Sequence, residues 1–305
     1  MSLPAFFEPL LREQYGSDLT SLILDGCRAR RTTLRANALK ATPEAVAACL
    51  DEAGISYGRV DWYPDAFVLS PGVQARDVWA LPLYEQGSLY LQSLSSMLPV
   101  LVLGPKAGLD VLDMCAAPGG KTTQMAALTG GRAHITACEM HMPRAEKLRF
   151  NLERQGVTNV NVMQVDARRL DDFFRFDQIL LDAPCSGSGT LDEADPKVAK
   201  CFTPQLVSKS QSSQKALLKK ALSLLKPGGT LVYSTCSVLE GENEQVVRHA
   251  LAAVGKTGSY ELRPICAFEG DPALPLLPTT LEGTVCLRPT DLFEGFFMAK
   301  IARLA

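Results

Sequence analysis

Residues 109–128 read LDVLDMCAAPGGKTTQMAAL, which predicts an apolar strand, a turn of small residues and then a helix. The same alternation continues along the chain, with further apolar strands predicted at residues 135–139, 160–165, 178–182 and 230–234 and helices at 143–155 and 206–225. Residues 226–229, KPGG, are typical of the end of a helix. Strand–helix alternation of this kind predicts parallel βαβ units in an α/β fold with a doubly wound, mostly parallel sheet.

The first hundred residues have a different, mixed pattern. Apolar residues at helical spacing occur at 4–15 and 43–53, and strand-like segments at 32–39 and 66–70. We therefore predict a smaller α+β domain over residues 1–95, followed by the α/β domain over residues 96–305.

The turn at Cys115–Lys121 is the densest signal in the sequence. Small residues between a strand and a helix let a ligand approach the backbone near the amino terminus of that helix. The triphosphate-binding pattern GxxxxGK[ST] requires glycine at position 115, where Cys115 stands, and the NAD pattern GxGxxG is absent. A plain turn that only ends a strand is the alternative for this segment considered by itself.

Acidic residues stand at the carboxyl ends of the predicted strands, where ligands of doubly wound sheets bind. Glu139 ends the second strand and is suited to accept two hydrogen bonds from a ribose diol. Asp166 and Asp182 follow the third and fourth strands. A single strand-end acid is commonly a solvated side chain, but this series suits a neutral or cationic nucleoside and disfavours a polyphosphate.

The chain has 9 cysteines and no CxxC pair, so we expect no metal centre and no disulfide framework. Cys185 lies in DAPCSGSG after the fourth strand, and Cys236 lies in STCS after the fifth. Both are expected at the ligand edge of the sheet as reactive thiols. The alternative for a cysteine is a small buried apolar residue, and we expect this role for the six at 27, 49, 138, 201, 266 and 286.

The 305 residues carry 31 Lys+Arg and 33 Asp+Glu, a net charge of −2, which excludes a histone-like protein but allows local basic faces. Basic residues concentrate in two segments of the chain. They are Arg28, Arg30, Arg31, Arg35 and Lys40 in the first, and the lysines at 197, 200, 209, 215, 219 and 220 in the second. Such clusters suit phosphate contact. A solvated helix face is the alternative for the second cluster.

Several of these motifs together resemble one family, the RNA cytosine-5 methyltransferases of the RsmB/Nop2/Sun group. The segments that carry the resemblance are CAAPGGKT, DAPCSGSG, STCS followed by ExENE, LRANALK at 34–40, GSLYLQSLSSMLP at 87–99, NLERQGVTNV at 151–160 and GFFMAKI at 295–301. The resemblance implies a Rossmann-like methyltransferase domain, S-adenosyl-L-methionine as methyl donor and a cytosine in RNA as acceptor. Ribosomal RNA is the favoured target, and transfer RNA is the alternative.

The resemblance also implies roles for the site residues. Cys236 is the expected nucleophile that adds to carbon 6 of cytosine, and Cys185 is expected to assist release of the methylated base. Asp182 and, less directly, Lys121 are expected to hold the base. The expected cofactor residues are Cys115, Ala116, Ala117, Pro118, Gly119, Gly120, Lys121, Glu139, Arg144, Asp166 and Asp182.

Two other functions remain open at this point. One is a non-catalytic RNA-binding or ribosome-assembly factor that keeps a cofactor pocket, and the other is a methyltransferase that acts on DNA or on another base. The sequence has no signal peptide and no apolar run long enough for a bilayer, so we expect a cytoplasmic protein. We also expect a monomer that contacts RNA through residues 1–95.

Overall fold

The computed structural model describes residues 3–195, 197–255, 260–266 and 274–304. The chain forms two compact units. Unit 1 combines Met1–Arg30 with Asp172–Ala305, and unit 2 is Arg31–Asp171. The domain boundary expected at residue 95 falls inside unit 2. The division into domains at residue 95 stays a prediction.

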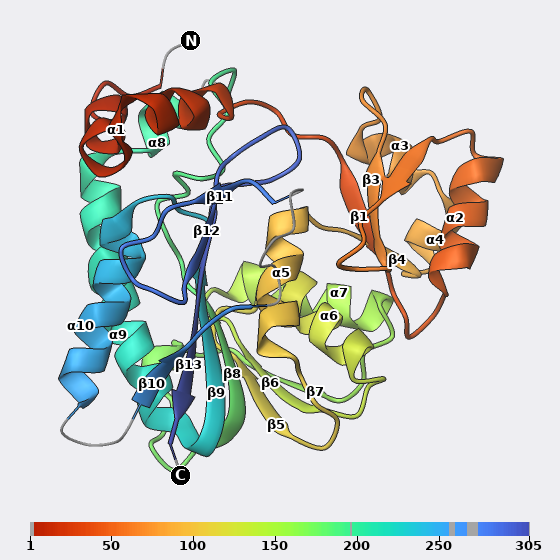
Figure 1. The fold of residues 1–305 in the computed structure, drawn as a ribbon. Coiled ribbons are helices and arrows are strands. Elements are labelled where there is room, and N and C mark those ends of the chain that lie inside the picture. The colour runs from red at the N-terminus through yellow and green to blue at the C-terminus, as the bar shows by residue number, and fades with distance from the viewer. Residues whose placement is uncertain (1–2, 196, 256–259, 267–273, 305) are drawn as a thin grey trace. The chain divides into compact units, whose positions relative to one another are not determined.

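Unit 2 begins with a four-stranded antiparallel sheet, whose strand order is β2-β3-β1-β4 (Figure 1). Its strands are β1 (Thr33–Ala36), β2 (Tyr57–Arg59), β3 (Ala66–Leu69) and β4 (Leu89–Leu91), and its helices are α2 (Pro43–Glu52), α3 (Ala75–Trp79) and α4 (Pro82–Glu85). The side chain of Thr42 accepts a hydrogen bond from Ala45 N and caps α2, and Pro43 occupies its first turn. Buried residues of β1, α2 and β3, among them Leu34, Leu50 and Phe67, form one apolar core.

The rest of unit 2 is the strand–helix alternation expected from the sequence. Its elements are α5 (Leu94–Leu103), β5 (Asp110–Asp113), α6 (Gly120–Leu128), β6 (His134–Cys138), α7 (Met142–Arg154), β7 (Val160–Met163) and the short 3-10 helix η1 (Ala167–Arg169). Strands β5, β6 and β7 are parallel neighbours. This order brings the carboxyl ends of the three strands, and so the turn after β5, Glu139 and Asp166, to one edge.

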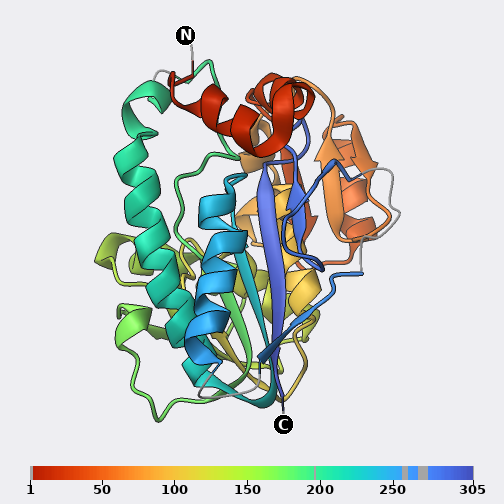
Figure 2. The same cartoon turned by 60° about the vertical axis from the view of Figure 1, so that its left-hand side comes forward.

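Unit 1 contains the parallel pair β8–β9 and a set of antiparallel strands. Its strands are β8 (Phe176–Asp182), β9 (Leu225–Thr235), β10 (Tyr260–Arg263), β11 (Leu276–Leu277), β12 (Val285–Leu287) and β13 (Phe296–Arg303). Its helices are α1 (Phe7–Asp25), α8 (Val198–Cys201), α9 (Pro204–Leu224), the 3-10 helix η2 (Glu240–Glu242) and α10 (Glu244–Val254). Helices α9 and α10 pack against each other beside β8 and β9, as Figures 1 and 2 show.

Most predicted elements match the structure within a few residues, with one correction at residues 226–229. The helix ends at Leu224 as expected, but Lys226–Gly229 belongs to β9 rather than to a turn. In the ladder with β8, Phe176 pairs with Leu225 and Gln178 pairs with Thr230, so four residues of β9 lie opposite Asp177. Lys226 Nζ contacts Asp177 Oδ2 at 2.9 Å, which ties this irregular stretch to β8.

Candidate active site

Unit 1 brings Cys185 and Cys236 into contact, with 3.1 Å between their Sγ atoms. Parallel pairing places Asp182, the last residue of β8, opposite Ser234 in β9. Cys236 comes directly after β9, and Cys185 lies three residues after β8. The structure thus brings together the two thiols that the sequence placed at the ends of neighbouring strands.

Contact and burial change the acidity of Cys185. The hydrogen bond with Cys236 and burial raise the pKa of Cys185 well above its ordinary value. A raised pKa favours the neutral thiol, so Cys185 keeps its proton near neutral pH. Either sulfur can act as the donor in the contact between the two cysteines.

Asp182 is partly buried beside the cysteine loops. Its Oδ1 accepts a hydrogen bond from Ser234 Oγ at 2.8 Å, and Ala183 N donates to Ser234 O at 2.8 Å. These two bonds fix the backbone and the carboxylate at the end of β8. A held carboxylate at this place suits recognition of a polar ligand edge.

Further bonds join the loop after β8 to the loop after β9. Gly189 N donates to Cys236 O at 3.0 Å, and Val238 N donates to Ser188 Oγ at 3.0 Å. Arg30 donates to the carbonyl oxygens of Gly189 at 2.9 Å and Thr190 at 3.3 Å. Burial lowers the pKa of Arg30, although neighbouring acidic groups that include Cys236 oppose this effect.

Glu242 is the residue of this site that sequence reasoning missed. It is fully buried, and its carboxylate accepts hydrogen bonds from Ser186, Ser237 and Gln214. The ExENE motif after Cys236 was the available signal, but the motif does not show that the carboxylate turns back toward both cysteine loops.

In unit 2, the turn between β5 and α6 is held from several sides. Arg144 Nη2 donates to Ala117 O at 2.8 Å, and Asn151 Nδ2 donates to Pro118 O at 2.8 Å. Gly119 has φ +108°, and a Cβ there would lie 2.9 Å from Leu148 Cδ1. The left-handed conformation therefore favours glycine at this position.

Glu139 and Arg144 meet beside this turn. Glu139 is 5% exposed, accepts a hydrogen bond from His141 N at 2.9 Å and lies 3.4 Å from Arg144 Nη1. Arg144 thus contacts both the acid after β6 and the turn after β5. These contacts bring together residues that the sequence predicted for one site.

Asp166 and Lys121 have partners within unit 2. Arg168 binds both carboxylate oxygens of Asp166, with a shortest distance of 2.7 Å. These hydrogen bonds hold the pKa of Asp166 below its usual range, so Asp166 stays an acceptor. Lys121 Nζ donates to Ser96 Oγ at 2.7 Å.

Comparison with known proteins identifies the family. The family described as 16S rRNA methyltransferase RsmB/F matches residues 100–302, and the ferredoxin-like domain of RsmF/B-like methyltransferases matches residues 3–76. This chain belongs to the RsmB/F family. The resemblance found in the sequence motifs is confirmed.

Curated relatives of this RsmB/F chain include proteins named ribosomal RNA small subunit methyltransferase F. The one from Cronobacter sakazakii is 36% identical over 317 residues, which cover 99% of this chain and 64% of that protein. The one from Vibrio vulnificus is 35% identical over 280 residues, which cover 90% and 58%. The chain therefore spans about three fifths of the length of these relatives.

Solved structures confirm the expected fold of the RsmB/F chain. A methyltransferase homolog from Pyrococcus horikoshii is 33% identical, with a TM-score of 0.81 over 98% of this chain and 95% of that one. NSun6 from the same organism, solved with SFG, has a TM-score of 0.85 at 24% identity and covers 99% and 98%. At that identity the second structure supports the fold alone. The Rossmann-like methyltransferase fold preceded by a smaller ferredoxin-like domain is thus established.

The basic residues of the RsmB/F chain differ in their availability. In the first cluster, predicted to suit phosphate contact, Arg35 is fully buried, and Lys40 Nζ donates to the carbonyl oxygens of Gln86 and Arg154. In the second cluster Lys209 and Lys219 are exposed, whereas Lys220 binds Asp172. Among the cysteines, Cys27, Cys138 and Cys286 are buried as expected and Cys49 is partly buried, but Cys201 and Cys266 are exposed.

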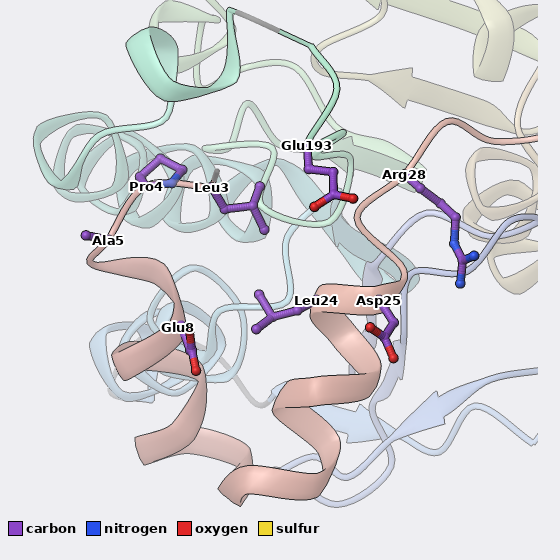
Figure 3. A pocket seen from close by; sticks show the side chains of 8 residues that line it. All are labelled: Leu3, Pro4, Ala5, Glu8, Leu24, Asp25, Arg28 and Glu193. Carbon is purple, nitrogen blue, oxygen red and sulfur yellow. The ribbon is translucent and has the colours of Figure 1, made fainter. Parts of the chain in front are cut away.

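Unit 1 has a hollow of about 650 Å³, and none of the predicted site residues lines it. It is lined at one end of the broken helix α1 by residues such as Glu8 and at the other by Leu24 and Asp25, with Glu193 opposite them (Figure 3). Within the described residues, no helix is long and apolar enough to cross a membrane, and no group of three or more His, Cys, Asp or Glu is arranged to hold a metal ion.

Proposed function

We propose that this RsmB/F chain is an S-adenosyl-L-methionine-dependent RNA (cytosine-5)-methyltransferase. The observation that carries the proposal is the pair of sulfur atoms, Cys185 and Cys236, in contact at 3.1 Å with Cys185 held protonated. A methyltransferase that acts at a more nucleophilic base position needs no thiol. Two thiols in contact at strand ends suit covalent activation of a base.

Carbon 5 of cytosine is too weak a nucleophile to accept a methyl group unaided. In the proposed reaction the Cys236 thiolate bonds to carbon 6, and the electron pair that this displaces makes carbon 5 nucleophilic. Asp182, whose Oδ1 accepts from Ser234 Oγ, is assigned to hydrogen-bond the ring edge of the cytosine. We assign Lys121 to the orientation of the base.

Release of the product reverses the addition. The proton on carbon 5 leaves to solvent, the bond between carbon 6 and sulfur breaks, and its electron pair returns to Cys236. Cys185, whose Sγ lies 3.1 Å from that of Cys236, is placed to assist this release. This assigns base attack to Cys236 and assistance of release to Cys185.

The residues of unit 2 fit S-adenosyl-L-methionine, which would supply the methyl group as an electrophilic sulfonium methyl. Helix α6 begins at the turn with no side-chain cap, so its backbone N–H groups suit the carboxylate of the methionine moiety. Cys115, Ala116, Ala117, Pro118, Gly119, Gly120 and Lys121 line this turn. We assign the ribose hydroxyls to Glu139, the adenine amine to Asp166 and packing against the adenosine to Arg144.

The proposed substrate is small-subunit ribosomal RNA, the RNA that the names of the curated relatives specify. A cytosine must leave its stack to reach a thiol, which favours loops and single-stranded segments. We assign RNA contact to residues 1–95, which include the part matched as a ferredoxin-like domain. Cytoplasmic location and a monomeric state stay predictions from the sequence.

The test is methyl transfer by the purified full chain. Small-subunit rRNA transcribed without modifications is incubated with S-adenosyl-L-methionine carrying an isotopically labelled methyl group, then digested and analysed by mass spectrometry for 5-methylcytidine. We expect label in 5-methylcytidine at one position, located by bisulfite sequencing, and none with Cys236→Ala. Binding of both ligands without transfer would favour an RNA-binding factor, and label in another nucleoside would overturn the cytosine assignment.

A further inference from the structure

One buried carboxylate, that of Glu242, lies between the two cysteine loops. Glu242 is 0% exposed and belongs to the short helix η2 that follows Cys236. Its Oε1 accepts from Ser186 N at 2.8 Å and from Gln214 Nε2 at 3.2 Å. Its Oε2 accepts from Ser186 Oγ at 2.5 Å and from Ser237 Oγ at 2.7 Å. Four hydrogen bonds thus satisfy a charge that would otherwise be costly to bury.

The donors of these bonds are the immediate neighbours of the two thiols. Ser186 follows Cys185, and Ser237 follows Cys236. Gln214, which donates to Glu242, also donates to Pro184 O at 3.0 Å, on the other side of Cys185. The carboxylate therefore holds the residue that follows each cysteine rather than the sulfur itself.

Glu242 also sets the direction of the hydrogen bonds between the loops. A serine hydroxyl has one proton, and Ser237 uses it on Glu242. Ser188 must then be the donor in its 2.8 Å contact with Ser237, and its oxygen accepts from Val238 N. The main chain of Glu242 is fixed in turn, because Tyr233 Oη donates to its carbonyl at 2.6 Å.

We propose that Glu242 is a positioning residue that holds Cys185 and Cys236 in contact for the reaction. This inference rests on the proposed function for its catalytic meaning, but the thiol contact can be measured separately. Reactive groups lose efficiency steeply when their supports allow them to move by a fraction of an ångström. Glu242 touches neither substrate nor cofactor in this assignment and acts through the two loops.

The experiment measures how readily the two thiols of the full chain combine. Two protein thiols and one glutathione disulfide give one protein disulfide and two glutathione thiols, and the Cys185–Cys236 peptide is quantified by mass spectrometry across glutathione redox ratios. Glu242→Gln keeps the shape of the side chain but replaces one carboxylate oxygen, a hydrogen-bond acceptor, with an NH2 group. Glu242→Ala removes the carboxylate. The matched control is Glu244→Gln, because Glu244 is also buried in this segment but accepts from Thr280 N.

We expect the equilibrium constant for the Cys185–Cys236 disulfide to fall about tenfold in Glu242→Gln and about 100-fold in Glu242→Ala, the effect of a ~1 Å displacement. Glu244→Gln should match the wild type. Methyl transfer at saturating substrate should fall in the same order, with the S-adenosyl-L-methionine Kd unchanged. If Glu242→Ala does not fold, as judged by circular dichroism, Ser186→Ala replaces it, because it removes one donor to Oε2.

An unchanged disulfide equilibrium in Glu242→Gln would overturn the proposal. An equal fall in Glu244→Gln, or a parallel loss of cofactor affinity, would reduce Glu242 to a general structural role. Absence of methyl transfer by the wild type would overturn the proposed function and leave the thiol measurement as a valid test of positioning.

Discussion

The Sγ atoms of Cys185 and Cys236 lie 3.1 Å apart although 51 positions separate them in the chain. The parallel pairing of β8 with β9 brings their loops together, and hydrogen bonds between the loops close the remaining distance. The hydrogen bond with Cys236 and burial raise the pKa of Cys185 well above its ordinary value. The proposed reaction gives the two thiols different roles.

This difference predicts opposite results for the two alanine variants. Cys236→Ala removes the attacking sulfur, so no RNA–protein adduct should form and methylation should fall by at least about 10³-fold. Cys185→Ala keeps the attacking sulfur but loses the neighbouring thiol that assists release, so a covalent RNA–protein adduct should accumulate. Denaturing gel electrophoresis with labelled RNA measures the adduct.

Cys201→Ala is the matched control for both variants, because Cys201 is an exposed cysteine of the same unit. It should methylate RNA at the wild-type rate without a stable adduct. An adduct in Cys236→Ala and none in Cys185→Ala would exchange the two assignments.

The strand–helix alternation was predictable from sequence because its signals are local. Apolar strands, helix-capping residues and glycine turns are determined by neighbours a few residues away, and β5 through β8 follow them closely. Residues 226–229 show where local signals fail. KPGG by itself favours a turn. The residues before and after it, Leu225 and Thr230, both pair with β8, so the segment is part of β9.

The site was predictable only as far as its residues lie at strand ends. The sequence placed Cys185, Cys236, Asp182 and Glu139 at or just after the carboxyl ends of strands, and each stands there in its own unit. Glu242 and the burial of Arg35 were not predicted, because both depend on hydrogen bonds between segments distant in sequence. Arginine in a basic stretch suggests a phosphate contact, whereas Arg35 bonds to Gln92, Gly120 and Thr123.

Arg35 should therefore support folding rather than RNA binding. Arg35→Met leaves the buried Oε1 of Gln92 without its donor and removes the bonds to Gly120 O and Thr123 Oγ1, which should lower the free energy of unfolding by about 3 kcal/mol. The unpartnered Nη1 of Arg35 limits the loss. Urea denaturation measures this, and Arg31→Met is the control, since Arg31 is partly buried and bonds to Leu69 O. Equal stability of the two variants would contradict the prediction.

Alkaline pH should destabilise the fold through Cys27. Burial raises the pKa of this thiol from its ordinary 9.0 to about 11. Between these values the unfolded chain loses the proton while the folded chain keeps it, so stability is full below pH 9 and falls as pH rises toward 11. The slope contributed by Cys27 is on the order of 1 kcal/mol per pH unit.

Urea denaturation at pH 8 and pH 10 tests this linkage. Cys27→Ala should lose part of the alkaline decrease, while Cys201→Ala, at an exposed position, should keep the wild-type slope. Other buried groups, such as Cys138 with its pKa raised to about 12 by burial, should leave a residual decrease in every variant. An unchanged slope in Cys27→Ala would refute the assignment.

Helix α9 carries two adjacent lysines, Lys219 and Lys220, whose variants can distinguish RNA contact from ion pairing within the protein. Lys219 is exposed, whereas the side chain of Lys220 is 15% exposed and binds Asp172 at 2.5 Å. A lysine that neutralises one phosphate adds about one to the slope of log affinity against log salt concentration. We expect Lys219→Ser to weaken binding of the RNA substrate and to reduce this slope by about one, and Lys220→Ser to leave both close to wild type. Fluorescence anisotropy with labelled RNA over a series of salt concentrations measures the slope. Equal slopes for wild type and Lys219→Ser would assign α9 to a solvated face and direct the search for phosphate contacts to residues 1–95.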